Sequence, residues 1–250
     1  MWRNALVTGA SSGIGESFAR LLAARGVDLV LVARRAELLE SLASELRAEC
    51  GIGVEVVPAD LGRDLAAVEE RAAGVELLIN NAGYGAFGAF HELGLDDQLA
   101  EIALNVTALT RLTHAALPGM VERGRGGILN VASVAAFAPA PGSAVYGATK
   151  AYVTSLTESL HAELKPRGVH VTALCPGFTR TEDDAPTGLM WMKRQKVADA
   201  GLKAVERGRA FCVPGAQYKA LVPALKIAPR GALRSASAAL WHRAFRTHGG

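Results

Sequence analysis

The sequence has few of the features that mark metal proteins, disulfide-bonded proteins and membrane proteins. It contains three cysteines in 250 residues (Cys50, Cys175 and Cys212) and no CxxC pair, which argues against a disulfide framework and a zinc site. Its six histidines show no HxxxH or HExxH spacing, so no metal is expected. No apolar run approaches the ~18 residues that span a bilayer, and the N-terminus lacks a signal-peptide layout. These absences predict a soluble, cytoplasmic protein of a reducing compartment.

Acidic residues are scarce in the last quarter of the chain. Residues 1–190 carry 15 basic and 22 acidic side chains, whereas residues 191–250 carry 12 basic and 2 acidic ones. The basic residues are scattered and no DNA-binding motif accompanies them, so no nucleic-acid partner is expected. The C-terminal segment is therefore strongly basic, whereas the rest of the chain carries a net negative charge.

Short apolar runs alternate with amphipathic helical patterns over the first 215 or so residues. Near-continuous Val, Leu and Ile strands separated by helices predict a parallel sheet covered on both faces. The expected strands are Asn4–Thr8, Asp28–Ala33, Gly53–Pro58, Leu77–Asn80, Gly127–Ala132, His170–Cys175 and Ala210–Val213. The expected helices lie near 13–25, 35–49, 64–73, 95–122, 145–165 and 184–207. The pattern predicts a doubly wound α/β domain over 1–215, about seven strands, with a basic helical extension over 216–250.

A glycine-rich turn, TGASSGIG at 8–15, follows the first predicted strand and precedes a helix. Glycines let the backbone approach a pyrophosphate, whose charge the N-terminus of the helix favours. Glycine is common in turns of every kind, so the motif is informative because of the strand before it and the helix after it. The residues expected to bind a dinucleotide here are Thr8, Gly9, Ser11, Ser12, Gly13, Ile14 and Gly15.

The end of the second predicted strand bears on the choice of cofactor. A site that prefers NAD usually has Asp or Glu here to bind the ribose 2′-hydroxyl. This chain has Arg34 and Arg35, and no carboxylate before Glu37. Guanidinium groups suit a 2′-phosphate, so NADP (NADPH) is the expected cofactor. The alternative is that the two arginines only solvate the turn.

Polar and small residues follow the next two strands. Asp60 and Leu61 could meet an adenine by a hydrogen bond and an apolar contact, or Asp60 could cap the following helix. Asn105 lies inside an otherwise regular helical pattern, where its amide could bend the helix or hold a water. The segment after the fourth strand is small enough to pass close to a cofactor, and its expected binding residues are Asn81, Ala82 and Gly83.

The stretch from Ser133 to Lys150 contains the candidate catalytic groups. Tyr146 precedes Lys150 by four residues, which places both side chains on one face of a helix. A nearby ammonium favours the phenolate and is expected to lower the pKa of Tyr146 toward the working range. Ser133 ends a buried strand, from which its hydroxyl could hold a substrate oxygen. The alternative is that Tyr146 and Lys150 are only a pair on a helix surface.

Taken together, these motifs make the chain resemble a short-chain dehydrogenase/reductase of the short type with a TGxxxGxG fingerprint. The resemblance covers about residues 4–215 and implies a Rossmann-type fold and an NADP-dependent oxidoreductase. It also implies a homodimer or homotetramer packed through the helices near 95–122 and 145–165. It rests on TGASSGIG (8–15), Asp60, NNAG (80–83), Asn105, Ser133, YGATK (146–150) and PGFTRT (176–181).

The resemblance implies a role for each matching residue. Tyr146 is the expected acid/base, Lys150 lowers its pKa and binds the nicotinamide ribose, and Ser133 orients the substrate oxygen. Asn105 is expected to anchor a water in a proton relay. The residues implied around the nicotinamide carboxamide are Pro176, Gly177, Thr179 and Thr181.

The substrate is expected to meet the variable loops Tyr84–Leu93 and Val134–Val145 and a lid from about Phe178 to Gln195. Their apolar residues would favour a small hydrophobic ketone, aldehyde or secondary alcohol, although such residues also serve ordinary packing. Those residues are Tyr84, Phe87, Phe90, Phe137, Met190, Trp191 and Met192. The acidic Glu182–Asp184 suits the first turn of a helix.

Two further expectations concern the extension and the class of function. Pro223 is expected to break or kink a helix over 216–227. A second helix over 232–246 places Leu233, Leu240, Trp241, Ala244 and Phe245 toward one side. That helix could contact an anionic membrane, pack on the domain or on another subunit, or fray. A non-catalytic NADP(H)-binding sensor or scaffold protein is the alternative function, although such relatives tend to lose the Tyr/Lys pair that this chain keeps.

Overall fold

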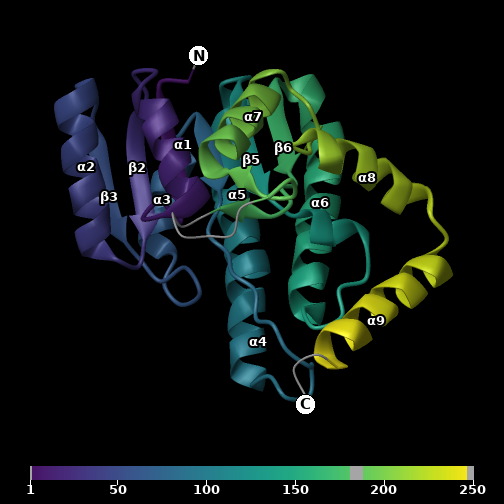
Figure 1. Cartoon of the computed structure of the whole chain (residues 1–250). Coiled ribbons are helices and arrows are strands. Elements are labelled where there is room, and N and C mark those ends of the chain that lie inside the picture. The colour runs from purple at the N-terminus through teal and green to yellow at the C-terminus, as the bar shows by residue number, and fades with distance from the viewer. Residues whose placement is uncertain (1, 181–187, 247–250) are drawn as a thin grey trace.

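The computed structural model describes residues 2–180 and 188–246. At its centre is a parallel sheet of seven strands in the order β3-β2-β1-β4-β5-β6-β9 (Figure 1). The strands are β1 (Asn4–Thr8), β2 (Asp28–Ala33), β3 (Val54–Pro58), β4 (Leu77–Asn80), β5 (Gly126–Val131), β6 (Val169–Leu174) and β9 (Phe211–Cys212). Each predicted strand is present within one or two residues of its expected ends, and the doubly wound fold is confirmed.

Helices cover both faces of the sheet. One face carries α1 (Gly13–Ala23), α2 (Ala36–Cys50) and α7 (Arg194–Glu206). The other carries α3 (Ala66–Gly74), α5 (Leu109–Glu122) and α6 (Ala144–Leu164), with short 3-10 turns at Val134–Phe137 and Lys165–Arg167. In Figure 1, α2 and β3 lie at one end of the sheet, and β6 and α6 lie toward the other.

The strand sequences explain why both faces are covered. Side chains alternate between the faces of a strand, so a strand that is apolar at every position needs a core on each side. In β1, Ala5 and Val7 belong to the core under α1, α2 and α7, whereas Leu6 belongs to the core under α3 and α5. All three side chains are fully buried.

The predicted helix over 95–122 is one continuous run with a wider turn inside it. It begins as α4 (Leu95–Ile102), passes through a π-helical turn at Ala103–Ala108 and continues as α5. The prediction of a helix over 184–207 was wrong at its start, because α7 begins at Arg194. A short parallel ladder precedes it, formed by β7 (Thr179–Arg180) and β8 (Met192–Lys193). The backbone N–H of Met192 donates to the Phe178 carbonyl at 2.9 Å, which holds the chain extended there.

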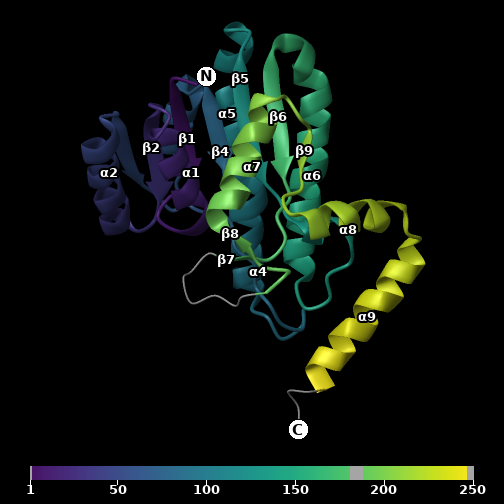
Figure 2. The same cartoon turned by 45° about the horizontal axis from the view of Figure 1, so that its top comes forward.

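The C-terminal extension consists of α8 (Ala216–Ile227) and α9 (Arg230–Arg246), which lie beyond the β9 end of the sheet (Figure 2). Pro223 does not break the helix as one of the two expectations had it, because it lies inside α8. Of the apolar residues of α9, Leu233 is buried and Leu240 is exposed. Trp241 lies so close to Gly142 that a Cβ there would come within 1.8 Å of its ring. Leu233 and Trp241 thus pack on the protein rather than facing outward together with Leu240.

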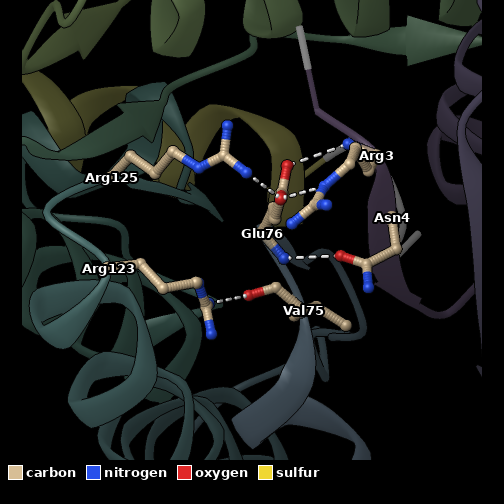
Figure 3. A network of polar contacts seen from close by, with 6 residues as sticks. All are labelled: Arg3, Asn4, Val75, Glu76, Arg123 and Arg125. Carbon is tan, nitrogen blue, oxygen red and sulfur yellow. Dashed lines mark hydrogen bonds and ion pairs between the residues drawn. The ribbon is translucent and has the colours of Figure 1, made fainter.

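A buried carboxylate joins the amino ends of three neighbouring strands (Figure 3). Glu76, just before β4, accepts hydrogen bonds from the backbone N–H of Arg3 at 2.9 Å, Arg3 Nε at 2.7 Å and Arg125 Nη2 at 2.7 Å. Its own N–H donates to Asn4 Oδ1 at 2.7 Å. Burial raises the pKa of Glu76, but the hydrogen bonds from Arg3 and the charge of Arg125 outweigh burial and lower it. This network lies at the edge of the sheet opposite the carboxyl ends of its strands.

Within residues 2–180 and 188–246, no helix is long and apolar enough to cross a membrane. The same residues hold no cluster of three or more His, Cys, Asp or Glu side chains suited to a metal ion. The three cysteines are free thiols.

Candidate active site

A cleft of about 800 Å³ opens at the carboxyl ends of the central strands. It lies where the strand order reverses, between β1 and β4, which is the usual ligand position in a doubly wound sheet. Most of the residues expected to act on a cofactor or substrate line it: Gly9, Ser11, Ser12, Gly13, Ile14, Arg34, Arg35, Asp60, Leu61, Asn81, Ala82, Gly83, Ser133, Tyr146, Lys150, Pro176, Gly177 and Thr179. Thr8, Gly15 and Asn105 lie behind this wall, and Thr181 is outside the described residues.

The glycine-rich turn needs its glycines. Gly9 and Gly13 have φ values of +66° and +62°, which strain residues that carry a Cβ. A Cβ on Gly15 would come within 2.1 Å of the Gly9 carbonyl oxygen. The turn can therefore close tightly at the start of α1, where backbone N–H groups and the helix dipole favour an anion.

Thr8 fastens this turn to the segment after β4. Its hydroxyl accepts hydrogen bonds from the backbone N–H groups of Asn81 at 2.9 Å and Ala82 at 3.0 Å. The amide of Asn81 donates in return to the Thr8 carbonyl at 2.9 Å. Thr8 thus shapes the cleft without lining it, which the turn motif alone did not predict.

Two arginines stand beside the glycine-rich turn. Arg35 Nη2 donates to Ser11 Oγ at 3.0 Å and to Ser12 Oγ at 2.8 Å. Arg34 also lines the cleft, as does Arg63, which the sequence reasoning missed. The two guanidinium groups after β2 therefore face the cleft rather than only the solvent, which bears against the interpretation that they merely solvate the turn.

Asp60 follows β3 and forms a local turn. Its Oδ1 accepts a hydrogen bond from the Gly62 N–H at 3.0 Å. The alternative that Asp60 caps the next helix was wrong, because α3 begins only at Ala66, after Leu65. Asp60 and Leu61 are both part of the cleft wall.

Asn105 lies in the π-helical turn and holds the segment after β4. Its Nδ2 donates to the Tyr84 carbonyl at 2.8 Å and to Thr149 Oγ1 at 3.2 Å, and its Oδ1 accepts from the Tyr84 N–H at 3.2 Å. A Cβ on Gly83 would come within 2.8 Å of Asn105 Oδ1 and 3.3 Å of Lys150 Nζ. The missing side chain at Gly83 thus lets the backbone pass between the amide and the ammonium.

Ser133, two residues after β5, and Tyr146, at the start of α6, both line the cleft. Ser133 Oγ accepts a hydrogen bond from the Ala135 N–H at 3.1 Å at the start of a 3-10 turn, and the residue is 8% exposed. Burial raises the pKa of Tyr146, and a hydrogen bond with Ser133 offsets part of that rise. The two hydroxyl groups therefore face the same part of the cleft.

Lys150 is buried beside the Tyr146 ring. Its Nζ donates to the Val131 carbonyl at 2.9 Å and lies 5.6 Å from the centroid of that ring. Burial lowers the pKa of Lys150 to about 8. The expectation that Lys150 brings the pKa of Tyr146 down toward the working range was wrong, since burial dominates and the pKa of the phenol is raised.

Glu101 is a buried charge near this site that the sequence reasoning missed. It is fully buried in α4, its Oε2 accepts from the Ala86 N–H at 3.1 Å, and its Oε1 has no hydrogen-bond partner among the described residues. Burial raises its pKa, while the Ala86 N–H and the charge of Lys150 lower it. A signal was present, because Glu101 precedes Asn105 by four residues and so shares its inward helix face.

The apolar substrate wall is only partly where it was expected. Tyr84 and Phe87 line the cleft, and the ring centroids of Phe87 and Tyr146 are 6.2 Å apart. Phe137, Trp191 and Met192 instead line a second cavity, separate from the cleft. The reason is that β7 and β8 pair beyond Phe178 and turn the Trp191–Met192 segment toward α8.

The segment after β6 forms the wall of the cleft next to Ser133. Gly177 is pressed against Tyr218 of α8, since a Cβ there would come within 1.9 Å of the Tyr218 ring. Thr179 Oγ1 donates to the Gly177 carbonyl at 3.0 Å, and the Pro176 carbonyl accepts from the Val134 N–H at 3.0 Å. The acidic Glu182–Asp184 lies outside the described residues.

Comparison with known proteins accounts for this arrangement. The family model described as short chain dehydrogenase matches residues 3–189. The chain belongs to the short-chain dehydrogenase family. A short-chain dehydrogenase from Sphingobium yanoikuyae, solved in complex with NADPH, is 42% identical with a TM-score of 0.82, covering 89% of this chain and 91% of that one.

Two more similar proteins carry names that state an activity. A bulky-bulky ketone specific alcohol dehydrogenase from Comamonas testosteroni is 39% identical with a TM-score of 0.81, covering 89% of this chain and 91% of that one. A very-long-chain 3-oxoacyl-CoA reductase from Anas platyrhynchos is 33% identical over 229 residues, 85% of this chain and 72% of the relative. The predictions of this family and of an oxidoreductase enzyme are confirmed.

Proposed function

We propose that this protein uses NADPH to reduce the carbonyl group of an apolar ketone or aldehyde. The observation that carries the proposal is a single cleft with Ser133, Tyr146 and Lys150 at one end and the glycine-rich turn and two arginines at the other. The NADPH complex of the Sphingobium relative and the bulky-ketone name of the Comamonas relative support it.

The residues present fit such a cofactor. Gly9 and Gly83 line the cleft without side chains and so leave room for the cofactor, and Gly15 lets the turn behind the wall close. Arg34 and Arg35 would bind the 2′-phosphate, with the Ser11 and Ser12 hydroxyls close to Arg35. The remaining contacts would come from Asp60 and Leu61 at the adenine, Lys150 and Tyr146 at the nicotinamide ribose, and Pro176, Gly177 and Thr179 at the carboxamide.

The chain's own groups suit the proton-transfer half of the reaction. When bound, the cofactor supplies the hydride. The raised pKa of Tyr146 keeps its phenol protonated at neutral pH, so it can give a proton to the substrate oxygen. The Ser133 hydroxyl would hold that oxygen, and the ammonium of Lys150 would stabilise the phenolate left behind. A water held near Asn105 would return the proton.

The substrate is expected to be apolar near its carbonyl. Phe87 is 74% exposed although its ring lies beside the Tyr146 ring, and Tyr84 is 41% exposed. An apolar ketone or aldehyde would cover both rings and release the water that they order. A strongly charged substrate would gain no binding free energy from contact with these two rings.

The experiment is NADPH oxidation with ketones and aldehydes of increasing apolar size, with NADH beside it. Tyr146→Phe should abolish turnover because the acidic proton is lost, and should weaken NADPH binding by no more than about tenfold because one of several contacts to the cofactor is lost. Tyr152→Phe is the matched control, since this tyrosine lies on the same helix and bonds Thr110 Oγ1 at 3.0 Å at the surface. Tight NADPH binding without turnover on any substrate would favour the sensor function, and substantial turnover in Tyr146→Phe would contradict the assigned acid.

We also propose that copies of the chain associate through the α4–α6 side. Leu95, Leu99 and Tyr152 are 66%, 52% and 40% exposed on these helices, which is unusual for large apolar side chains unless a partner covers them. Domain 1–215 would then form the subunit contact, with 216–250 packed on the same domain. The molar mass by light scattering tests this, and a monomer at micromolar concentration would contradict it.

A further inference from the structure

A second cavity, of about 880 Å³, lies between α7, β9 and α8. Among the described residues it shares no lining residue with the cleft. It lies toward the end of the sheet from which α8 and α9 extend, as Figure 2 shows for these helices. Its volume falls in the range that holds a drug-sized small molecule.

The floor of the cavity is apolar and its rim is cationic. Aromatic rings from three separate segments, Phe137, Trp191 and Phe211, form the floor together with Val222. None of the described lining residues is acidic. The rim consists of Lys193, Lys196, Lys203, Arg207, Arg209, Lys219 and Lys226. Much of the positive charge that distinguishes residues 191–250 in the sequence is therefore gathered around one cavity.

Among the residues that the structure describes, few of these cations have a counter-charge. Among the residues described, one ion pair involves the rim, between Lys203 Nζ and Asp199 Oδ2 at 2.6 Å. Lys226 Nζ instead lies over the Phe211 ring at 4.3 Å from its centroid and over Phe137 at 5.2 Å. Like charges gathered over low-dielectric walls attract anions from solution. The rings next to Lys226 would at the same time take up an apolar group.

A second copy of the chain fits this cavity poorly. A symmetric dimer contact would face the same cationic rim against itself, and like charges brought together oppose association. A long nucleic acid would need a continuous basic track, whereas these cations surround a cavity floored with aromatic rings. The two features together, a cationic rim and an apolar floor, match a small molecule that has both an anionic end and an apolar end.

We propose that this cavity binds a free anionic amphiphile, with its phosphate or carboxylate group on the rim and its apolar chain on the aromatic floor. Arg207 and Arg209 present planar guanidinium groups that suit two-point contact with phosphate or carboxylate oxygens. Binding at this site does not depend on the proposed reaction, since it uses no residue of the cleft.

Titration calorimetry of the full chain with dodecyl phosphate, below its micelle concentration, tests the proposal. We expect one site per chain whose affinity falls as salt is raised. Dodecyl maltoside, which has the same chain and a neutral head, and inorganic phosphate, which has no chain, should each bind at least tenfold more weakly. Equal binding by either compound would overturn the amphiphile assignment.

Matched charge reversals locate the site. Arg207→Glu with Lys219→Glu should weaken dodecyl phosphate at least tenfold, whereas Lys165→Glu with Arg167→Glu, the same change in charge on an exposed turn that does not line the cavity, should weaken it less than twofold. Circular dichroism of both double variants would check that they fold. An equal effect of the two pairs would overturn the location. Binding to phosphatidylglycerol vesicles without binding of free dodecyl phosphate would overturn the free ligand in favour of a membrane surface.

Discussion

Lys150 should make the stability of the protein rise with pH in the alkaline range, in the direction opposite to ordinary alkaline unfolding. Burial lowers its pKa to about 8, against the ordinary value of 10.5. Below pH 8 both the folded and the unfolded chain carry the proton, and holding the buried ammonium costs the folded state roughly 3 kcal/mol. Above pH 8 the folded chain releases the proton while the unfolded chain keeps it until about pH 10.5. Because the unfolded state then binds more protons, the contribution of Lys150 to stability rises across this window.

Lys150→Met removes the charge and keeps a side chain of similar length. At pH 7 the variant escapes the roughly 3 kcal/mol cost but loses the hydrogen bond to the Val131 carbonyl, worth about 1–1.5 kcal/mol. The variant should therefore be more stable than the natural protein by about 1–2 kcal/mol at pH 7. The advantage should disappear by pH 10, because the natural protein gains roughly 2–3 kcal/mol over that range and the variant does not.

Urea unfolding of both proteins at several pH values between 7 and 10 gives the difference in unfolding free energy. Taking the difference removes the titration of groups that the two proteins share. Lys165→Met, an exposed lysine just beyond the same helix, serves as the control and should show no such trend. A difference between natural protein and Lys150→Met that stays constant within about 0.5 kcal/mol would refute the buried ammonium as a stability cost.

Three other substitutions follow from the same physical arguments. Arg34→Asp should weaken NADPH binding about ten- to a hundred-fold and leave NADH binding little changed, because it removes a charge-assisted contact to the 2′-phosphate. Fluorescence titration with both cofactors measures the two affinities. Equal losses of affinity for NADPH and NADH would contradict the assignment of Arg34 to the 2′-phosphate. Glu101→Gln should move the alkaline limb of the kcat profile to lower pH, because the Glu101 carboxylate raises the pKa of Tyr146. Glu76→Gln should cost about 1–3 kcal/mol of unfolding free energy at pH 7. That cost should shrink as the pH falls through the lowered pKa of Glu76, where the natural carboxyl also becomes neutral; an unchanging cost would contradict the role of charge.

The fold could be predicted because its signals are local. Runs such as Leu29–Ala33 are apolar at every position and so require a core on both faces, and glycines at positive φ mark the turns that follow. The site motifs could be predicted for a related reason, since the carboxyl ends of parallel strands bring Gly9, Asn81 and Ser133 to one edge. Spacing along the chain is enough for both inferences.

What could not be predicted depends on packing between distant segments. The pKa of Tyr146 is governed by burial rather than by the nearby lysine, and burial follows from loops far away in the sequence. Phe137 and Trp191 are 54 residues apart and line a second cavity, because Val222 of α8 packs on the cluster that holds Phe137 and Phe211. The spacing of Glu101 from Asn105 predicts that Glu101 faces inward. It does not predict that Glu101 Oε1 lacks a hydrogen-bond partner among the described residues.

Two buried charges lie at opposite ends of the strands of the same sheet. One contributes to the stability of the fold, and the other lies where the reaction is expected. Glu76, at the amino ends of the strands, is matched by three donors from Arg3 and Arg125, and its pKa is lowered in the direction that favours folding at neutral pH. Lys150, at the carboxyl ends, has one carbonyl partner, and its pKa is lowered in the direction that opposes folding at neutral pH. A fold selected only for stability would pair or remove that ammonium, as it pairs the carboxylate. An ammonium kept short of partners beside a phenol is what a phenolate formed during turnover would need. Lys150 therefore lies at the carboxyl ends of the strands, where the reaction is expected. Glu76 lies at the amino ends, where its hydrogen bonds hold neighbouring strands together.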